Sequence, residues 1–169
     1  MRLSYWIEVI LLPMRRIAVL ALTFAAAAAA AAPATVTPAD IENATGLKGV
    51  HLVPATAPGS VPGRDNYADA SGKVVLWFQS IPGPLFARAK ATPAKTTSGI
   101  EVEPKLFHAA VAGLGDEAFD SPDGKQQHAL YVRKGDSAFG LISNLDRAGK
   151  PIVSVEQLKA LAKTILPRM

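Results

Sequence analysis

The residues QHALYVRKGDSAFGLISN, positions 127–144, decide the fold of this chain. The first half of this stretch alternates, so that Leu130 and Val132 share one face of the chain, as is typical of a half-buried β-strand. Lys134-Gly135-Asp136 has the composition of a tight hairpin connection. The chain then returns as a second apolar strand that ends at Asn144. The stretch therefore predicts an antiparallel β-hairpin.

A helix is predicted directly after this hairpin, over residues 154–166. Ser154 is followed by Gln157 three residues later, which is a capping box. Pro167 ends the helix because proline cannot continue the helical hydrogen bonds. One side of the helix is apolar, as expected for a helix that packs on a sheet. That apolar stripe consists of Val155, Leu158, Leu161, Ala162 and Ile165.

The preceding part of the chain has a similar order of elements. Thr37-Pro38-Ala39-Asp40 predicts a helix start and Gly46 its end. The other expected elements are a loop at 54–64, a short strand at 66–68, a central strand at 73–79, a helix at 85–91, a flexible connector at 92–99, a strand at 118–120, a turn at 121–124 and a loop at 146–151.

Hairpin-like pairs of strands followed by a helix thus occur at 66–91 and again at 127–166. The fold class predicted from this order is α+β, an antiparallel sheet with helices packed on one face. Such a two-layer sandwich would contain two halves of similar pattern, although the residues of the two halves share little identity. The aromatic residues of the expected strands, such as Trp77 and Phe139, are predicted to lie in its core.

An export signal is predicted over residues 1–34. Arg15 and Arg16 form a charged segment, and the apolar run IAVLALTFAAAAAAAAPA follows directly. Ala32 and Ala34 occupy the −3 and −1 positions of a signal-peptidase site. The alternative is that the apolar run remains as a membrane anchor, although it is shorter than the roughly 20 residues that span a bilayer.

Processing at this site leaves Thr35 as the first residue, so residues 35–169 are expected to form one α+β domain. Residues 1–13 are expected not to be translated, because signal peptides do not normally carry such an extension ahead of the charged segment, and Met14 is then the start. The predicted location is the periplasm or the extracellular space. The only predicted contact with a membrane is through an uncleaved signal.

Charge and composition exclude several classes of function. Without residues 1–34 the chain keeps 15 basic and 13 acidic residues, so its net charge falls from +4 to +2. The basic residues are scattered rather than clustered, so no nucleic-acid partner is expected. The chain contains no cysteine, which excludes a lipoprotein anchor, a thiol nucleophile and cysteine metal sites.

The segment VAGLGDEAF, residues 111–119, is the most unusual short motif of the chain. Together with YVRKGDSAFGL and the closing LKALAKTILPRM, it resembles small exported bacterial domains of unknown function. Actinobacterial lipoproteins and the extracellular sensor domains of some kinases are similar. The resemblance covers residues 105–169 and implies an α+β fold with no established catalytic residues. The anchor cysteine and the paired cysteines of that group are missing here.

The glycines of this motif indicate a structural role rather than a nucleotide site. A dinucleotide fingerprint needs a third glycine and a strand–helix unit around it, and both are absent. Gly113 and Gly115 instead predict an unusual backbone, with Leu114 and Phe119 as anchors in the core. The carboxylates of Asp116 and Glu117 are predicted to accept backbone hydrogen bonds, and the alternative is a calcium ion held by the acidic cluster to which they belong. This acidic cluster consists of Asp116, Glu117, Asp120 and Asp123.

No catalytic, cofactor-binding or metal-binding residue is predicted, and no cofactor. His51, His108 and His128 are far apart in the sequence and lack the spacing of zinc ligands. No nucleophile elbow or phosphate-binding loop is present. The predicted function is therefore an exported, non-enzymatic binding or accessory module for a protein, a peptide or a small molecule. The alternative is a small periplasmic hydrolase with a dispersed active site.

Overall fold

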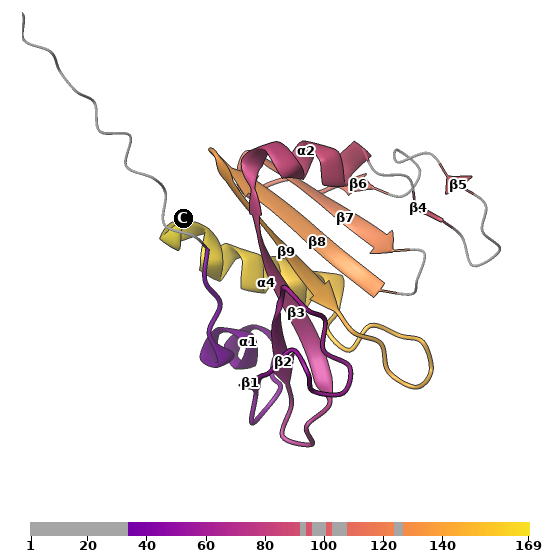
Figure 1. Ribbon diagram of the computed structural model, residues 1–169. Helices are drawn as coiled ribbons and strands as arrows, with labels where there is room; N and C mark the ends of the chain where they lie inside the picture. The colour runs from indigo at the N-terminus through magenta and orange to yellow at the C-terminus, as the bar shows by residue number, and fades with distance from the viewer. Residues whose placement is uncertain (1–33, 92–93, 96–100, 103–107, 124–126) are drawn as a thin grey trace, which may run out of the picture.

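A seven-stranded antiparallel sheet organises the computed structural model, which describes residues 34–91, 94–95, 101–102, 108–123 and 127–169 (Figure 1). The strands are β1 (His51–Val53), β2 (Asp65–Ala68), β3 (Val74–Pro82), β6 (Ala109–Ala110), β7 (Glu117–Asp123), β8 (Gln127–Lys134) and β9 (Ser137–Ser143). They lie side by side in the order β1-β2-β3-β9-β8-β7-β6. A separate antiparallel pair joins β4 (Ala94–Lys95) to β5 (Glu101–Val102).

The predicted hairpin is confirmed as β8 and β9. Leu130 pairs with Leu141 and Val132 with Phe139, and all four of these side chains are buried on one face of the sheet. The connection is a two-residue turn in which Gly135 has a positive φ of 56°. Glycine adopts this left-handed conformation without the steric cost that a Cβ imposes.

The predicted central strand is confirmed as β3, which pairs with β2 on one side and with β9 on the other. This position explains why its sequence is apolar throughout. Phe78 lies in the main core with Phe139, whereas Trp77 belongs to a separate cluster with Ile142 on the opposite face. Both faces of β3 are covered, so the residues that point to either face of the sheet are apolar.

The helices of the described residues lie on both faces of the sheet. They are α1 (Pro38–Thr45), α2 (Gly83–Ala91) and α4 (Val155–Ile165), and a 3-10 turn η1 (Leu166–Arg168) follows α4. Residues of α1 and α4, such as Ile41 and Leu161, join the main core with Phe139. Phe86 of α2 instead packs with Phe119 on the opposite face.

The α+β class is therefore confirmed, but the prediction that all helices lie on one face holds for α1 and α4 and is wrong for α2. Alternation along the strands separates the two helix positions. On β9, Phe139 points toward α4, and its neighbour Ala138 points toward Phe86 of α2. Strands preceding a helix occur in both halves, yet α2 and α4 lie on opposite faces, so the similarity of the halves is limited to the strands.

The capping box predicted at Ser154 is present, and the helix start predicted at Thr37 has a capping box as well. Thr37 accepts a hydrogen bond from the backbone N–H of Asp40, and Ser154 accepts one from Gln157, while each partner side chain accepts a bond in return. Gly46 ends α1 with a φ of 77°. Four residues of the predicted α4 stripe are fully buried, and the fifth, Val155, is half-buried at the first turn.

The chain just after the predicted cleavage site is fixed to the core. Val36 is buried, and its carbonyl oxygen accepts a 2.7 Å hydrogen bond from the Tyr67 hydroxyl. Burial, together with the negative charges of Asp65 and Asp40, raises the pKa of Tyr67 to about 12. The phenol therefore remains a hydrogen-bond donor across the physiological pH range.

Two predictions about local structure need correction. The turn expected at 121–124 is wrong for its first part, because β7 continues through Asp123 and Ser121 is buried. Its neighbour β6 begins at Ala109, opposite Asp120. Among the described residues, Pro122 therefore has no strand partner on the β6 side, and proline is tolerated at such an edge position. The strands β1 and β6 were not predicted. Most of the connector expected at 92–99 lies outside the described residues.

In the part of the chain that the structure describes, every helix is too short or too polar to cross a membrane.

Candidate functional site

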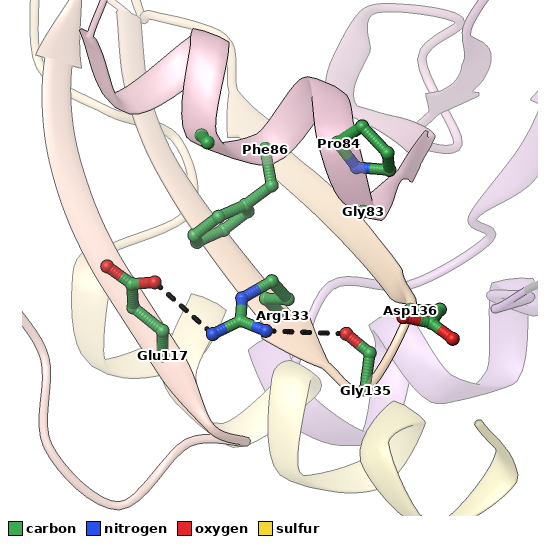
Figure 2. A pocket seen from close by; sticks show the side chains of 8 residues that line it. Gly83, Pro84, Phe86, Glu117, Arg133, Gly135 and Asp136 are labelled. Atoms are coloured by element: carbon green, nitrogen blue, oxygen red, sulfur yellow. Dashed lines mark hydrogen bonds and ion pairs between the residues drawn. The ribbon is translucent and has the colours of Figure 1, made fainter.

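A cavity of about 330 Å³ lies between the first turns of α2 and the β8–β9 hairpin (Figure 2). Helix α2 contributes apolar groups to its wall, and β7 and the hairpin contribute charged groups. The lining residues are Gly83, Pro84, Phe86, Ala87, Glu117, Arg133, Gly135 and Asp136. A cavity of this size is at the lower end of the range for small-molecule sites in proteins.

Two backbone contacts fix the walls of this cavity relative to each other. The N–H of Gly83 donates a 3.0 Å hydrogen bond to the carbonyl of Asp136, which joins the start of α2 to the hairpin turn. A Cβ built on Gly83 would lie 2.8 Å from that same carbonyl oxygen. Only glycine permits so close an approach of the two backbones.

The VAGLGDEAF motif has the structural role that its two glycines predict, because it holds the hairpin turn that forms one wall of the cavity. The N–H of Asp116 donates to the Arg133 carbonyl at 2.8 Å, and the Asp116 carboxylate accepts the N–H of Gly135 at 2.7 Å. Gly113 and Gly115 have positive φ values of 77° and 59°. The predicted anchors Leu114 and Phe119 are both buried. The motif therefore clamps the hairpin turn.

Arg133 is the central charged group of the cavity. Its guanidinium lies 3.5 Å from the Glu117 carboxylate and 3.4 Å from the Gly135 carbonyl oxygen, and it lies over the Phe86 ring at 5.9 Å from the centroid (Figure 2). Both polar contacts are longer than an ordinary charge-assisted hydrogen bond. The side chain is held in place by these contacts, and they engage two of its five N–H donors.

Glu117 balances the cations at one end of the cavity. Lys90 of α2 donates a hydrogen bond to its carboxylate, and this contact lowers the pKa of Glu117, with a further contribution from Arg133. Glu117 is therefore ionised at neutral pH. This result differs from the prediction that Glu117 accepts backbone hydrogen bonds, because strand β7 directs its side chain to the α2 side of the sheet.

The acidic cluster of the motif does not gather into one site. Asp116 binds the hairpin turn, whereas Asp120 faces the opposite side of the sheet from Glu117. Asp120 is half-buried, and burial raises its pKa despite the nearby charges of His128 and Lys159. No group of three or more metal-ligating side chains occurs among the described residues, and the side chain of Asp123 lies outside that part.

The histidines do not meet either. His51 is exposed on β1, and His108 and His128 are half-buried. His108 packs its ring against Phe119 at 4.8 Å between centroids. His128 pairs across the strands with Ser143, on the face that also carries Asp120.

This Asp120–His128–Ser143 arrangement has the residue types of a hydrolytic triad but lacks a free nucleophile. The Ser143 hydroxyl donates to the Asn144 carbonyl and accepts the Val153 N–H, each at 2.9 Å, and Ser143 is fully buried. A nucleophilic serine needs its hydroxyl directed to a base and accessible to substrate. The arrangement therefore favours a structural role.

Neither a protein-family model, a characterised protein nor a solved structure matches this chain.

Sequence reasoning missed the residues that form the cavity. Arg133 and Asp136 lie in the hairpin segment and Phe86 in the α2 segment, and each has an ordinary role in its own element. The available signal was the charged pattern around the hairpin turn, where Arg133, Lys134 and Asp136 flank Gly135. Nothing local indicates that α2 closes over this turn.

Proposed function

We propose that the chain is an exported, non-enzymatic binding module whose binding site is the cavity between α2 and the β8–β9 turn. The observation that carries this proposal is the preorganised wall around Arg133. Its guanidinium is fixed by Glu117, by the Gly135 carbonyl and by the Phe86 ring, and its two polar contacts engage two of its five N–H donors. A fixed polar group beside an apolar wall is the usual composition of a small-molecule site.

The scaffold supports binding better than chemistry. The cavity holds no serine, threonine, histidine or tyrosine that could serve as nucleophile or general base among its described lining residues. Of the two acidic residues that line the cavity, Glu117 is neutralised by Lys90 and Arg133, and its lowered pKa makes it a poor proton acceptor at neutral pH.

Titration of the purified protein with four probes that share one branched hydrocarbon chain tests whether the cavity binds ligands. The probes are 3-methylbutanol, 4-methylpentanoate, 3-methylbutylamine and L-leucine, followed by amide chemical shifts. We expect one or more probes to shift the amides of Phe86, Ala87 and Gly135. Ala87→Trp should remove these shifts by filling the cavity, and Ala160→Trp, at an exposed position of α4, should leave them unchanged. The proposal fails if no probe shifts these amides at millimolar concentration.

Export is tested by the intact mass of the protein in cell fractions. The order of charged, apolar and small residues at 15–34 motivates the expectation that the mature chain begins at Thr35 and occurs in the periplasm or the medium. A full-length species that retains residues 17–32 in the membrane fraction would contradict the proposal.

A further inference from the structure

We infer that the cavity takes the zwitterion of an α-amino acid, with the carboxylate at Arg133, the ammonium at Asp136 and the side chain against Pro84 and Ala87. This inference rests on the proposed function, because it names the ligand class of the same cavity. It begins from two opposite charges that line one cavity without pairing with each other (Figure 2).

Arg133 supplies the anion-binding half. Its planar guanidinium has five N–H donors that match a carboxylate in a two-pronged arrangement. Its contacts with Glu117 and Gly135, at 3.5 and 3.4 Å, engage two of these five donors. The Glu117 carboxylate is also bound by Lys90, so this end of the cavity has two cations for one anion. The surplus positive charge favours an anionic group there.

Asp136 supplies the cation-binding half. Its backbone carbonyl accepts a hydrogen bond from the Gly83 N–H, which fixes the position of the residue in the wall of the cavity. Its carboxylate makes no hydrogen bond or ion pair with any side chain in the described ranges. On the far side of Gly135, the Asp116 carboxylate is already bound to the turn. The carboxylate of Asp136 thus remains available to an ammonium group.

Arg133 and Asp136 line the same cavity at one tight turn, so a ligand that carries both an anionic and a cationic group matches the two residues. An α-amino acid has its ammonium and its carboxylate on one carbon. The remaining wall is apolar, with Pro84 and Ala87 exposed and the Phe86 ring beneath them. A cavity of about 330 Å³ accommodates a free amino acid with an aliphatic side chain. Ion pairs at exposed positions are weak, so we expect a Kd on the order of 0.1–1 mM.

The same four probes separate this inference from the proposed function. L-leucine carries both charges, 4-methylpentanoate only the negative one, 3-methylbutylamine only the positive one, and 3-methylbutanol neither. We expect leucine to bind at least fivefold more tightly than each of the other three. If the single-charge probes or the alcohol shift the cavity amides as strongly as leucine does, the cavity binds ligands but the zwitterion assignment is wrong. If none of the probes shifts them, both proposals fail.

Charge variants assign the two halves. Asp136→Asn should weaken binding of leucine and of the amine but leave the carboxylate probe unaffected. Arg133→Gln should weaken leucine and the carboxylate probe but leave the amine unaffected. Asp65→Asn and Arg147→Gln change the same charges at exposed positions away from the cavity and should not alter any Kd. Equal loss of all probes in both cavity variants would overturn the two-charge arrangement.

Discussion

Gly115 carries two separate constraints that a substitution can measure. Its φ of 59° is left-handed, and a Cβ built on it would lie 2.3 Å from the Arg133 carbonyl oxygen. The left-handed conformation costs a residue with a Cβ about 1–2 kcal/mol. The contact must be relieved by a backbone shift, which breaks the hydrogen bond from the Asp116 N–H to the same oxygen, a loss of about 0.5–1.5 kcal/mol. Gly115→Ala should therefore cost about 1.5–3.5 kcal/mol.

Gly113→Ala is the matched control. Gly113 has a similar positive φ of 77°, but a Cβ there would meet nothing within 4 Å. It should cost only the conformational part, about 1–2 kcal/mol. The difference between the two variants then isolates the close approach of the motif to β8.

Urea unfolding monitored by fluorescence measures both variants. Trp77 is a suitable probe because it is buried, and its indole N–H donates to the Gly59 carbonyl. The midpoint of Gly115→Ala should lie clearly below that of Gly113→Ala at an unchanged slope. Equal midpoints would refute the argument that the Arg133 carbonyl leaves no room for a side chain.

Leu161→Ala should lower the free energy of unfolding by about 2–5 kcal/mol, because Leu161 is fully buried on the sheet-facing side of α4. Lys163→Ala, on the exposed side of the helix, should lower it by under about 0.5 kcal/mol. A small loss for Leu161→Ala would mean that the apolar stripe is not packed. Asp120→Asn should raise the Tm at pH 7, because burial raises the pKa of Asp120 and its ionisation above that pKa destabilises the folded state. Below the unfolded pKa of about 3.9, Asp120 is protonated in both the folded and the unfolded state, so the gain in Tm should vanish. Glu117→Gln should lower the Tm at neutral pH, because the hydrogen bond from Lys90 lowers the pKa of Glu117. The stability that ionised Glu117 contributes is complete above the unfolded pKa of about 4.3 and is lost as the pH falls through the folded pKa. Glu156→Gln is the exposed control. Asp116→Asn should cost little, because the amide oxygen still accepts the Gly135 N–H, and calcium should raise the Tm of neither protein; a rise in the wild type alone would make the motif a metal site.

The elements that sequence reasoning identified are those with a local cause. The alternation of residues 127–133, the Ser154–Gln157 capping box and the apolar stripe of α4 are each complete within one segment, so no knowledge of the rest of the chain was needed. The short strands β1 and β6 span three and two residues, which is too few to show a period. They exist because longer neighbouring strands offer them hydrogen bonds.

The cavity could not be predicted because its walls meet only through long-range contacts. The Gly83–Asp136 hydrogen bond joins segments far apart in the sequence, and neither residue signals the other. The face on which α2 lies is likewise decided by Phe86 fitting between Ile81, Phe119 and Ala138, which come from three different strands. The role of the VAGLGDEAF motif was predictable because two nearby glycines indicate a backbone requirement by themselves.

The pairing of β3 with β9 has a consequence for the order in which the chain folds. Leu76 lies opposite Ser143 and Pro82 opposite Ser137, so the centre of the sheet closes only when the C-terminal third of the chain is available. Synthesis delivers β1, β2 and β3 first. Until β9 arrives, the most apolar strand of the protein has an unpaired edge, which is a template for association with other chains. The pairing of β3 with β9 closes a long loop of the chain, which is a slow step. Before that step, residues 74–82 are the segment that a holding chaperone would protect.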